Sequence, residues 1–276
     1  MKQIKRLPIS VQYASVSDIG GRKTNQDDTC IANYGHRQLF VVSDGAGGHA
    51  GGAIAARLAV EAALMAFKNA AEVELDEIVM SCLHAARKSI LTQQAQLPDM
   101  QDMTATIVIV VLDLQMRKAS VVHLGDSRLY AFRRGRTLHI TRDHSLVQGL
   151  IDVGMWPAER LLDHPQRSVL YGALGSEEEP DPAMLKIEHL DLRDGDALLL
   201  CSDGWWECVS TPTMEHYLMQ STSAQEWITQ MLSVVQGSSA GGRDNSTAIG
   251  VWLGEPHRVT LQPFGDTVLI ANPRDT

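Results

Sequence analysis

Apolar and polar positions change their spacing several times along the chain, and these changes predict an alternation of strands and helices. Apolar residues recur at helical spacing over residues 50–69 and 75–96, which predicts two long helices. Shorter apolar or alternating runs predict strands at residues 11–17, 31–42 with a hairpin turn near Tyr34 and Gly35, 104–112, 118–123, 127–133, 137–140, 197–202 and 246–253. We expect the runs between residues 104 and 140 to form a meander. The order of elements indicates antiparallel sheets flanked by helices, and it argues against repeated βαβ units.

A long irregular stretch separates the helical patterns of the second half. Asp143, His144 and Ser145 open a short helix that runs to Val153, and we expect these three residues to cap it. Four prolines interrupt residues 154–182, which predicts a long loop with about one helical turn.

The remaining segments of the second half are simpler. We expect Trp156 and Tyr171 to anchor the long loop. Residues 212–236 predict one or two helices. Beyond the last long strand, residues 259–261 and 267–271 are candidates for short strands in a C-terminal extension.

Composition narrows the class of protein without naming an activity. The 276 residues are 44% hydrophobic and 21% charged, as expected for a soluble globular protein. The formal net charge of -9 argues against nucleic-acid binding, which needs a basic face. The four cysteines do not form a C-x-x-C pair, so a disulfide framework is not expected. No apolar stretch resembles a signal peptide or a membrane span, so we expect a cytoplasmic protein without membrane association.

Four aspartates stand where predicted strands begin or end: Asp44, Asp126, Asp203 and Asp244. Each is next to a Gly, Ser or Asn, and each alone is an ordinary turn signal. If the four converge at one end of a sheet, their charges repel and their burial is costly. A hard divalent cation with oxygen ligands removes both problems. The pattern therefore predicts a metal centre.

Seven short motifs in order resemble those of the metal-dependent protein phosphatases of type 2C, a serine/threonine class that includes bacterial members. They are Arg22-Lys23-Thr24-Asn25-Gln26-Asp27, Asp44-Gly45-Ala46-Gly47-Gly48-His49, Met103-Thr104-Ala105-Thr106, Gly125-Asp126-Ser127-Arg128, Asp143-His144-Ser145-Leu146, Ser202-Asp203-Gly204 and Gly242-Arg243-Asp244-Asn245. The resemblance implies an α+β fold, a four-layer αββα sandwich of two antiparallel β-sheets packed face to face with helices on both outer faces. It also implies a catalytic domain over residues 10–254, followed by a short extension at 255–276.

The same resemblance implies two magnesium or manganese ions. Asp44 would bridge them, the Gly45 carbonyl would help hold the second ion, and Asp203 and Asp244 would bind the first. A third ion is expected between Asp126 and Asp203, although an aspartate before a serine could equally form a plain turn.

Three further residues receive catalytic roles from the resemblance. Arg22 would grip the phosphate, His49 would protonate the leaving alkoxide, and Asn245 would orient a metal-bound water. Outside these motifs, Arg22 and His49 would be ordinary solvated side chains. Gln26 replaces the Glu of the family pattern, which is expected to alter the binding of the second ion.

The function implied is hydrolysis of phosphoserine and phosphothreonine in proteins by direct attack of a water that bridges the two ions. The expected partners are phosphorylated proteins and a cognate serine/threonine kinase, and we expect a monomer. Two alternatives remain open. One is a non-catalytic phosphoprotein-binding scaffold on the same fold. The other is a metal-dependent hydrolase of small phosphoesters, although the chain lacks the G-x-x-x-x-G-K-[ST] phosphate cradle.

Overall fold

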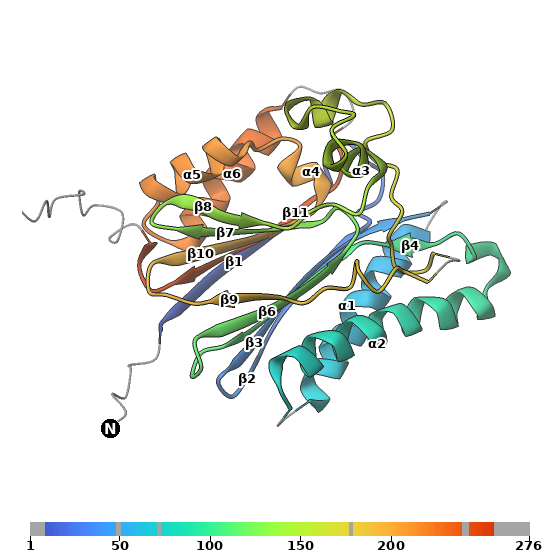
Figure 1. The fold of residues 1–276 in the computed structure, drawn as a ribbon, viewed down its shortest axis with the longest axis horizontal. Helices are drawn as coiled ribbons and strands as arrows, with labels where there is room; N and C mark the ends of the chain where they lie inside the picture. Colours follow the sequence, from blue (N-terminus) through green and yellow to red (C-terminus); the bar gives the residue numbers. More distant parts are fainter. Residues whose placement is uncertain (1–8, 48–50, 71–72, 177–178, 239–242, 257–276) are drawn as a thin grey trace, which may run out of the picture.

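Two antiparallel sheets lie face to face, and helices cover the outer side of each (Figure 1). The structure is a computed structural model, and it describes residues 9–47, 51–70, 73–176, 179–238 and 243–256. The expected four-layer αββα sandwich is confirmed. None of the helices in these ranges is long and apolar enough to cross a membrane.

Both sheets are built from antiparallel neighbours. The five-stranded sheet has the order β1 (Val11–Asp18), β11 (Ser246–Leu253), β10 (Asp196–Cys201), β7 (Arg128–Arg133) and β8 (Arg136–Ile140). The six-stranded sheet has the order β2 (Asp27–Tyr34), β3 (Arg37–Ala46), β5 (Ile107–Asp113), β6 (Lys118–Leu124) and β9 (Glu188–Asp191), and the short β4 (Thr104–Ala105) pairs with the end of β3.

The helices divide between the two outer faces. The six-stranded sheet packs against α1 (Gly51–Asn69) and α2 (Leu75–Gln96), and the five-stranded sheet packs against α4 (Asp203–Trp206), α5 (Thr211–Gln220) and α6 (Ala224–Gly237). The remaining elements are α3 (Leu146–Asp152) and the 3-10 turns η1 (Pro98–Met100) and η2 (Ala158–Asp163). In Figure 1, α3 lies at one end of the sandwich.

Strand residues alternate between two cores, as the two-residue period of a strand requires. On β3, Leu39 and Val41 pack against the helices, whereas Phe40 and Val42 belong to the core between the sheets. Fully burying one such side chain contributes about 1.5–3 kcal/mol. Because β3 is apolar on both faces, it is a central strand covered on both sides.

The predicted meander is wrong at one point, because β6 and β7 belong to different sheets. The chain crosses between the sheets at Gly125, where φ is 105°. A Cβ atom at this position would lie only 2.6 Å from the Thr106 Cγ2 atom, so a glycine is needed. The strand β9 and the short helix α4 were not predicted from the sequence.

The expected cap of the short helix is correct for one residue of three. The Ser145 hydroxyl accepts a hydrogen bond from the Gln148 amide at 3.2 Å and caps α3. Asp143 instead binds a buried arginine, and the His144 ring stacks on His123 with centroids 4.6 Å apart. Buried polar groups need partners, and Asp143 and His144 find theirs in distant residues and not at the end of the helix.

The long loop contains η2 and is held partly by its own side chains. The Trp156 indole donates to the Arg160 carbonyl at 2.8 Å and packs edge-on against His164, so it anchors the loop as expected. Tyr171 is 48% exposed and touches the His144 ring. The short strands expected at 259–261 and 267–271 lie outside the described residues.

Candidate metal centre

One pocket of about 290 Å³ opens where β3 and β10 end and β11 begins. Every predicted site residue that the structure describes lines this pocket: Arg22, Asp44, Gly45, Asp126, Asp203, Asp244 and Asn245. His49 lies outside the described residues. Segments separated by up to 222 positions in the chain therefore meet at one concave acidic surface.

The backbone around Asp44 is held on both sides. Its carbonyl accepts a hydrogen bond from the Thr106 amide at 2.7 Å, and its amide donates to the Thr106 hydroxyl at 3.1 Å. The next residue, Gly45, approaches the start of α1 so closely that a Cβ atom would collide with the Gly52 carbonyl. Asp27 faces Asp44 in the register of β2 and β3. A tight backbone thus places two carboxylates side by side.

The electrostatics of the pocket disfavour free carboxylates. Desolvation by the surrounding protein, reinforced by the charges of Asp203 and Asp27, raises the pKa of Asp44 well above its usual range. Desolvation and the Asp203 charge raise the pKa of Asp126 in the same way. For Asp203 and Asp27, desolvation raises the pKa of each carboxyl to about 6. A cluster of buried acids with raised pKa values favours either protonation or a compensating cation.

The donor atoms fit divalent cations. Among the described residues, the buried Asp27 Oδ1 and Asp203 Oδ1 atoms lack a hydrogen-bond partner. An unpaired buried carboxylate oxygen is costly unless a cation or donor satisfies it, and oxygen donors suit magnesium and manganese. No group of three His, Cys, Asp or Glu side chains in this part of the chain already forms an ion cage. One of the expected ligands, Asp244, is instead hydrogen-bonded to an arginine.

Arg22 is the partner of Asp244. Its guanidinium donates to the Asp244 Oδ2 atom at 2.6 Å, with both side chains partly exposed. The hydrogen bond and charge of Asp244 raise the pKa of Arg22. The predicted phosphate ligand and one predicted metal ligand are therefore bonded to each other at the rim of the pocket.

Asn245 is held by three hydrogen bonds to the backbone. Its Oδ1 atom accepts from the Gln26 amide at 2.8 Å, while its Nδ2 atom donates to the carbonyls of Ile19 at 2.9 Å and Thr24 at 3.1 Å. Both amide hydrogens are thus committed to the backbone, and the side chain is buried. Asn245 secures the loop that carries Arg22, and its expected part in orienting a metal-bound water stays a prediction.

A sequence profile of the family protein phosphatase 2C matches residues 16–253. The chain belongs to this family. The serine/threonine protein phosphatase PstP of Mycobacterium tuberculosis is 32% identical over 245 residues, covering 88% of this chain and 45% of PstP. The chain thus spans about half the length of that relative. The serine/threonine phosphatase stp of Listeria welshimeri is 29% identical over 235 residues, covering 83% of this chain and 90% of the relative.

A solved structure agrees with the fold. The catalytic domain of the serine/threonine protein phosphatase PstP in complex with two manganese ions superposes with a TM-score of 0.76 at 29% identity, covering 89% of this chain and 99% of that one. The protein phosphatase 2C fold expected from the motifs is therefore confirmed.

Some members of the family site were not singled out from the sequence. Thr106 closes the Met103–Thr106 motif, and besides holding Asp44 its hydroxyl lies 2.7 Å from that of Ser127. Ser168 and Leu170 reach the pocket from the long loop, where no pattern marks them. Asp27 is the last residue of the first motif, but no role was predicted for it. The Ser202 hydroxyl donates to the Asp27 Oδ2 atom at 2.8 Å, and this bond connects β2 to the end of β10.

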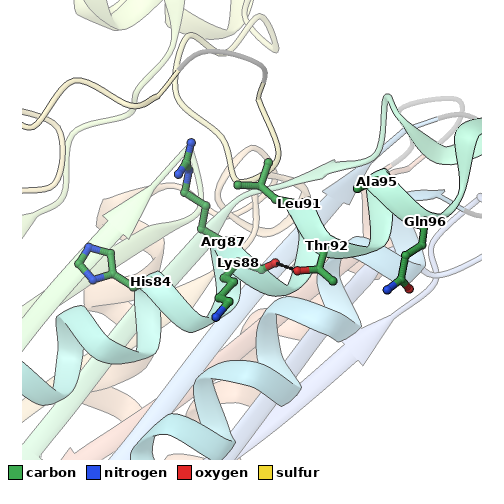
Figure 2. A pocket seen from close by; sticks show the side chains of 7 residues that line it. All are labelled: His84, Arg87, Lys88, Leu91, Thr92, Ala95 and Gln96. Atoms are coloured by element: carbon green, nitrogen blue, oxygen red, sulfur yellow. Dashed lines mark hydrogen bonds between the residues drawn. The ribbon is translucent and has the colours of Figure 1, made fainter.

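A second depression, of about 640 Å³, lies on the outer face of α2 (Figure 2). His84, Arg87, Lys88 and Leu91 line it, together with Thr92 and the end of the helix. None of the described residues that line it is a carboxylate, so these residues do not offer the ligands that the family motifs imply. The acidic pocket remains the candidate site.

Proposed function

We propose that this chain is a metal-dependent protein phosphatase that hydrolyses phosphoserine and phosphothreonine. The observation that carries the proposal is the convergence of Asp44, Asp126, Asp203 and Asp244 in one pocket that also contains Arg22. Among these carboxylates, three have raised pKa values and one has a buried oxygen without a partner. Divalent cations would compensate this charge, and a phosphate group would be their natural ligand.

The ligand roles follow the motifs. Asp44 would bridge two ions of magnesium or manganese, Asp203 and Asp244 would complete the first, and the Gly45 carbonyl would serve the second. Asp126 would share a third ion with Asp203. When bound, such ions supply an activated water and neutralise the developing charge of the phosphoryl group. Thr106 supports this set by fixing the Asp44 backbone.

Arg22 would bind the phosphate. A guanidinium offers a planar fork of donors that matches phosphate oxygens, and Arg22 stands at the rim of the pocket. In this role it would exchange its hydrogen bond with Asp244 for bonds to the substrate. His49, in the same motif as Asp44, remains the proposed donor of the proton that the leaving serine or threonine oxygen needs.

The substrates and partners follow from the same reasoning. Phosphorylated proteins would be the substrates, and a serine/threonine kinase would oppose the reaction. We further propose that the protein acts as a monomer in the cytoplasm, with residues 10–254 as its catalytic domain.

The proposal is tested with a phosphothreonine peptide and manganese. We expect turnover by the unmodified chain and a loss of at least about a thousandfold in kcat for Asp44→Asn and Asp203→Asn, since each removes a ligand charge. Asp99→Asn, at an exposed position on η1, is the matched control and should remain active. Full activity in excess chelator would overturn the metal mechanism.

Two measurements separate this function from the alternatives. A non-catalytic scaffold should bind divalent ions weakly in calorimetry and release no phosphate. A small-phosphoester hydrolase should turn over nucleotides faster than phosphopeptides. All four aspartates are present in the pocket, and this favours the catalytic reading.

A further inference from the structure

The helix α4 is linked to two of the carboxylates of the pocket. Asp203 is its first residue, and Trp206 is its last. The Trp206 indole donates a buried hydrogen bond of 2.9 Å to the backbone carbonyl of Asp126. Asp126 lies in the turn between β6 and β7, outside regular secondary structure. One turn of helix therefore carries Asp203 and also restrains Asp126.

The Trp206 ring is itself fixed in place. The Arg128 guanidinium lies over it, 3.5 Å from the ring centroid. Arg128 in turn donates two hydrogen bonds of 2.7 Å to the Asp143 carboxylate and one of 3.1 Å to the Tyr130 hydroxyl. Three hydrogen bonds fix this guanidinium, and it packs on the face of the indole and restricts the motion of the ring. The indole N–H direction is thus set before any ligand binds.

The neighbouring tryptophan shows that this hydrogen bond is not a general need of the helix. Trp205 is fully buried, and its Nε1 atom has no hydrogen-bond partner among the described residues. Buried indoles usually find an acceptor. The same short helix therefore leaves one indole unpaired while it directs the other at the backbone of Asp126.

We propose that Trp206 is a positioning residue for Asp126 and that it sets the affinity for a divalent ion held between Asp126 and Asp203. The inference rests on the proposed function for the existence of that ion. A group that orients a ligand typically changes metal affinity by about 10- to 100-fold when it is lost. Here the hydrogen bond acts on the backbone of the ligand, so we expect a loss of about tenfold at this ion alone.

The test measures manganese binding directly, by calorimetry and by electron paramagnetic resonance of free manganese. Trp206→Phe keeps an aromatic ring beneath Arg128 but removes the N–H donor. We expect the binding step of this third ion, identified as the step that is lost in Asp126→Asn, to weaken about tenfold and the other two steps to stay within twofold. Asp126→Asn marks the full loss of that step.

Trp205→Phe is the matched control, because it makes the same change at the adjacent buried position. We expect it to lower the melting temperature without changing any manganese step. If Trp206→Phe does not fold, benzothienylalanine at position 206 replaces only the N–H with sulfur and answers the same question.

Each outcome decides the inference. Equal losses for the two tryptophan variants would mean general loosening of α4, and an unchanged third step in Trp206→Phe would mean that Asp126 needs no restraint. Either result would overturn the role of Trp206 without contradicting the proposed function. A wild-type chain that binds no manganese would instead overturn the proposed function together with this inference.

Discussion

The Arg22 guanidinium and the Asp244 carboxylate are joined by a hydrogen bond of 2.6 Å, although 222 positions separate them in the chain. Arg22 belongs to the loop between β1 and β2, and Asp244 lies two residues before the start of β11. In this arrangement a protein cation already satisfies one of the proposed metal ligands. An ion and Arg22 therefore compete for the Asp244 carboxylate, so binding of the ion would release Arg22 to bind a phosphate.

Replacing Arg22 should separate substrate binding from metal binding. In Arg22→Ala we expect KM for a phosphothreonine peptide to rise about tenfold or more, because a charged hydrogen bond to phosphate is worth about 1.5–3 kcal/mol. Manganese affinity should stay equal or increase, since Asp244 loses a competing cation. Steady-state kinetics and calorimetry check both. Lys23→Ala is the control in the same loop, and weaker manganese binding in Arg22→Ala would contradict this competition.

Replacing Asn245 should lower the stability of the folded protein. Its side chain makes three hydrogen bonds to the backbone of residues 19–26. Each bond contributes about 0.5–1.5 kcal/mol, so Asn245→Ala should lower the free energy of unfolding by about 1.5–4.5 kcal/mol. Urea denaturation in the presence of chelator measures this without a contribution from metal. Asn33→Ala, at an exposed edge position, should cost less than about 0.5 kcal/mol. Equal costs would contradict the positioning role.

Arg128 compensates a buried charge. Its removal in Arg128→Met would leave the Asp143 carboxylate, 2% exposed, without its cation. Breaking such a pair from one side costs about 3–5 kcal/mol, whereas neutralising both sides costs much less. Denaturation curves should therefore show that Arg128→Met with Asp143→Asn recovers much of the loss. Arg142→Met removes an exposed partner of Asp152 and should change stability little. A double variant as unstable as the single one would exclude this account.

The contribution of His144 to stability should fall as the pH is lowered from 6.5 toward 4. Burial and the neighbouring His123 lower the pKa of His144 to about 4 from an ordinary value of 6.5. Between these values the unfolded chain binds a proton that the folded chain does not, so this contribution to the free energy of unfolding increases with pH in this window. The full difference is on the order of 3 kcal/mol.

The comparison of variants isolates this contribution from the carboxylates. His144→Gln should lower the slope of the free energy of unfolding against pH between 4 and 6.5 in urea titrations, whereas the raised pKa values of Asp27 and Asp203 act with the opposite sign in both proteins. The exposed His84 on α2 provides the control His84→Gln, which should retain the wild-type slope. A slope that survives in His144→Gln would assign the effect to other groups.

The layers of the fold were predictable because hydrophobic periods and strand-end aspartates are local signals. The alternation of Leu39 and Phe40 between two cores is one example. The motifs also identified the members of the pocket. The change of sheet at Gly125 could not be predicted from a local pattern, because the apolar residues of β7 fit the buried face of either sheet. The hydrogen-bond partners of the site residues could not be predicted either. The bonds of Asn245 to Ile19 and of Trp206 to Asp126 join distant parts of the chain and depend on tertiary packing.

The proposed ligands come from both sheets. Asp44 ends a strand of the six-stranded sheet, and Asp203 and Asp244 adjoin strands of the five-stranded one. The distance between these carboxylates thus depends on how one sheet is placed against the other. Substitutions such as Val108→Ala or Leu198→Ala, in the core between the sheets, would shift that placement. Affinity for the proposed ions would then report how the two sheets are aligned, and substitutions in the apolar interior would change it without changing any ligand.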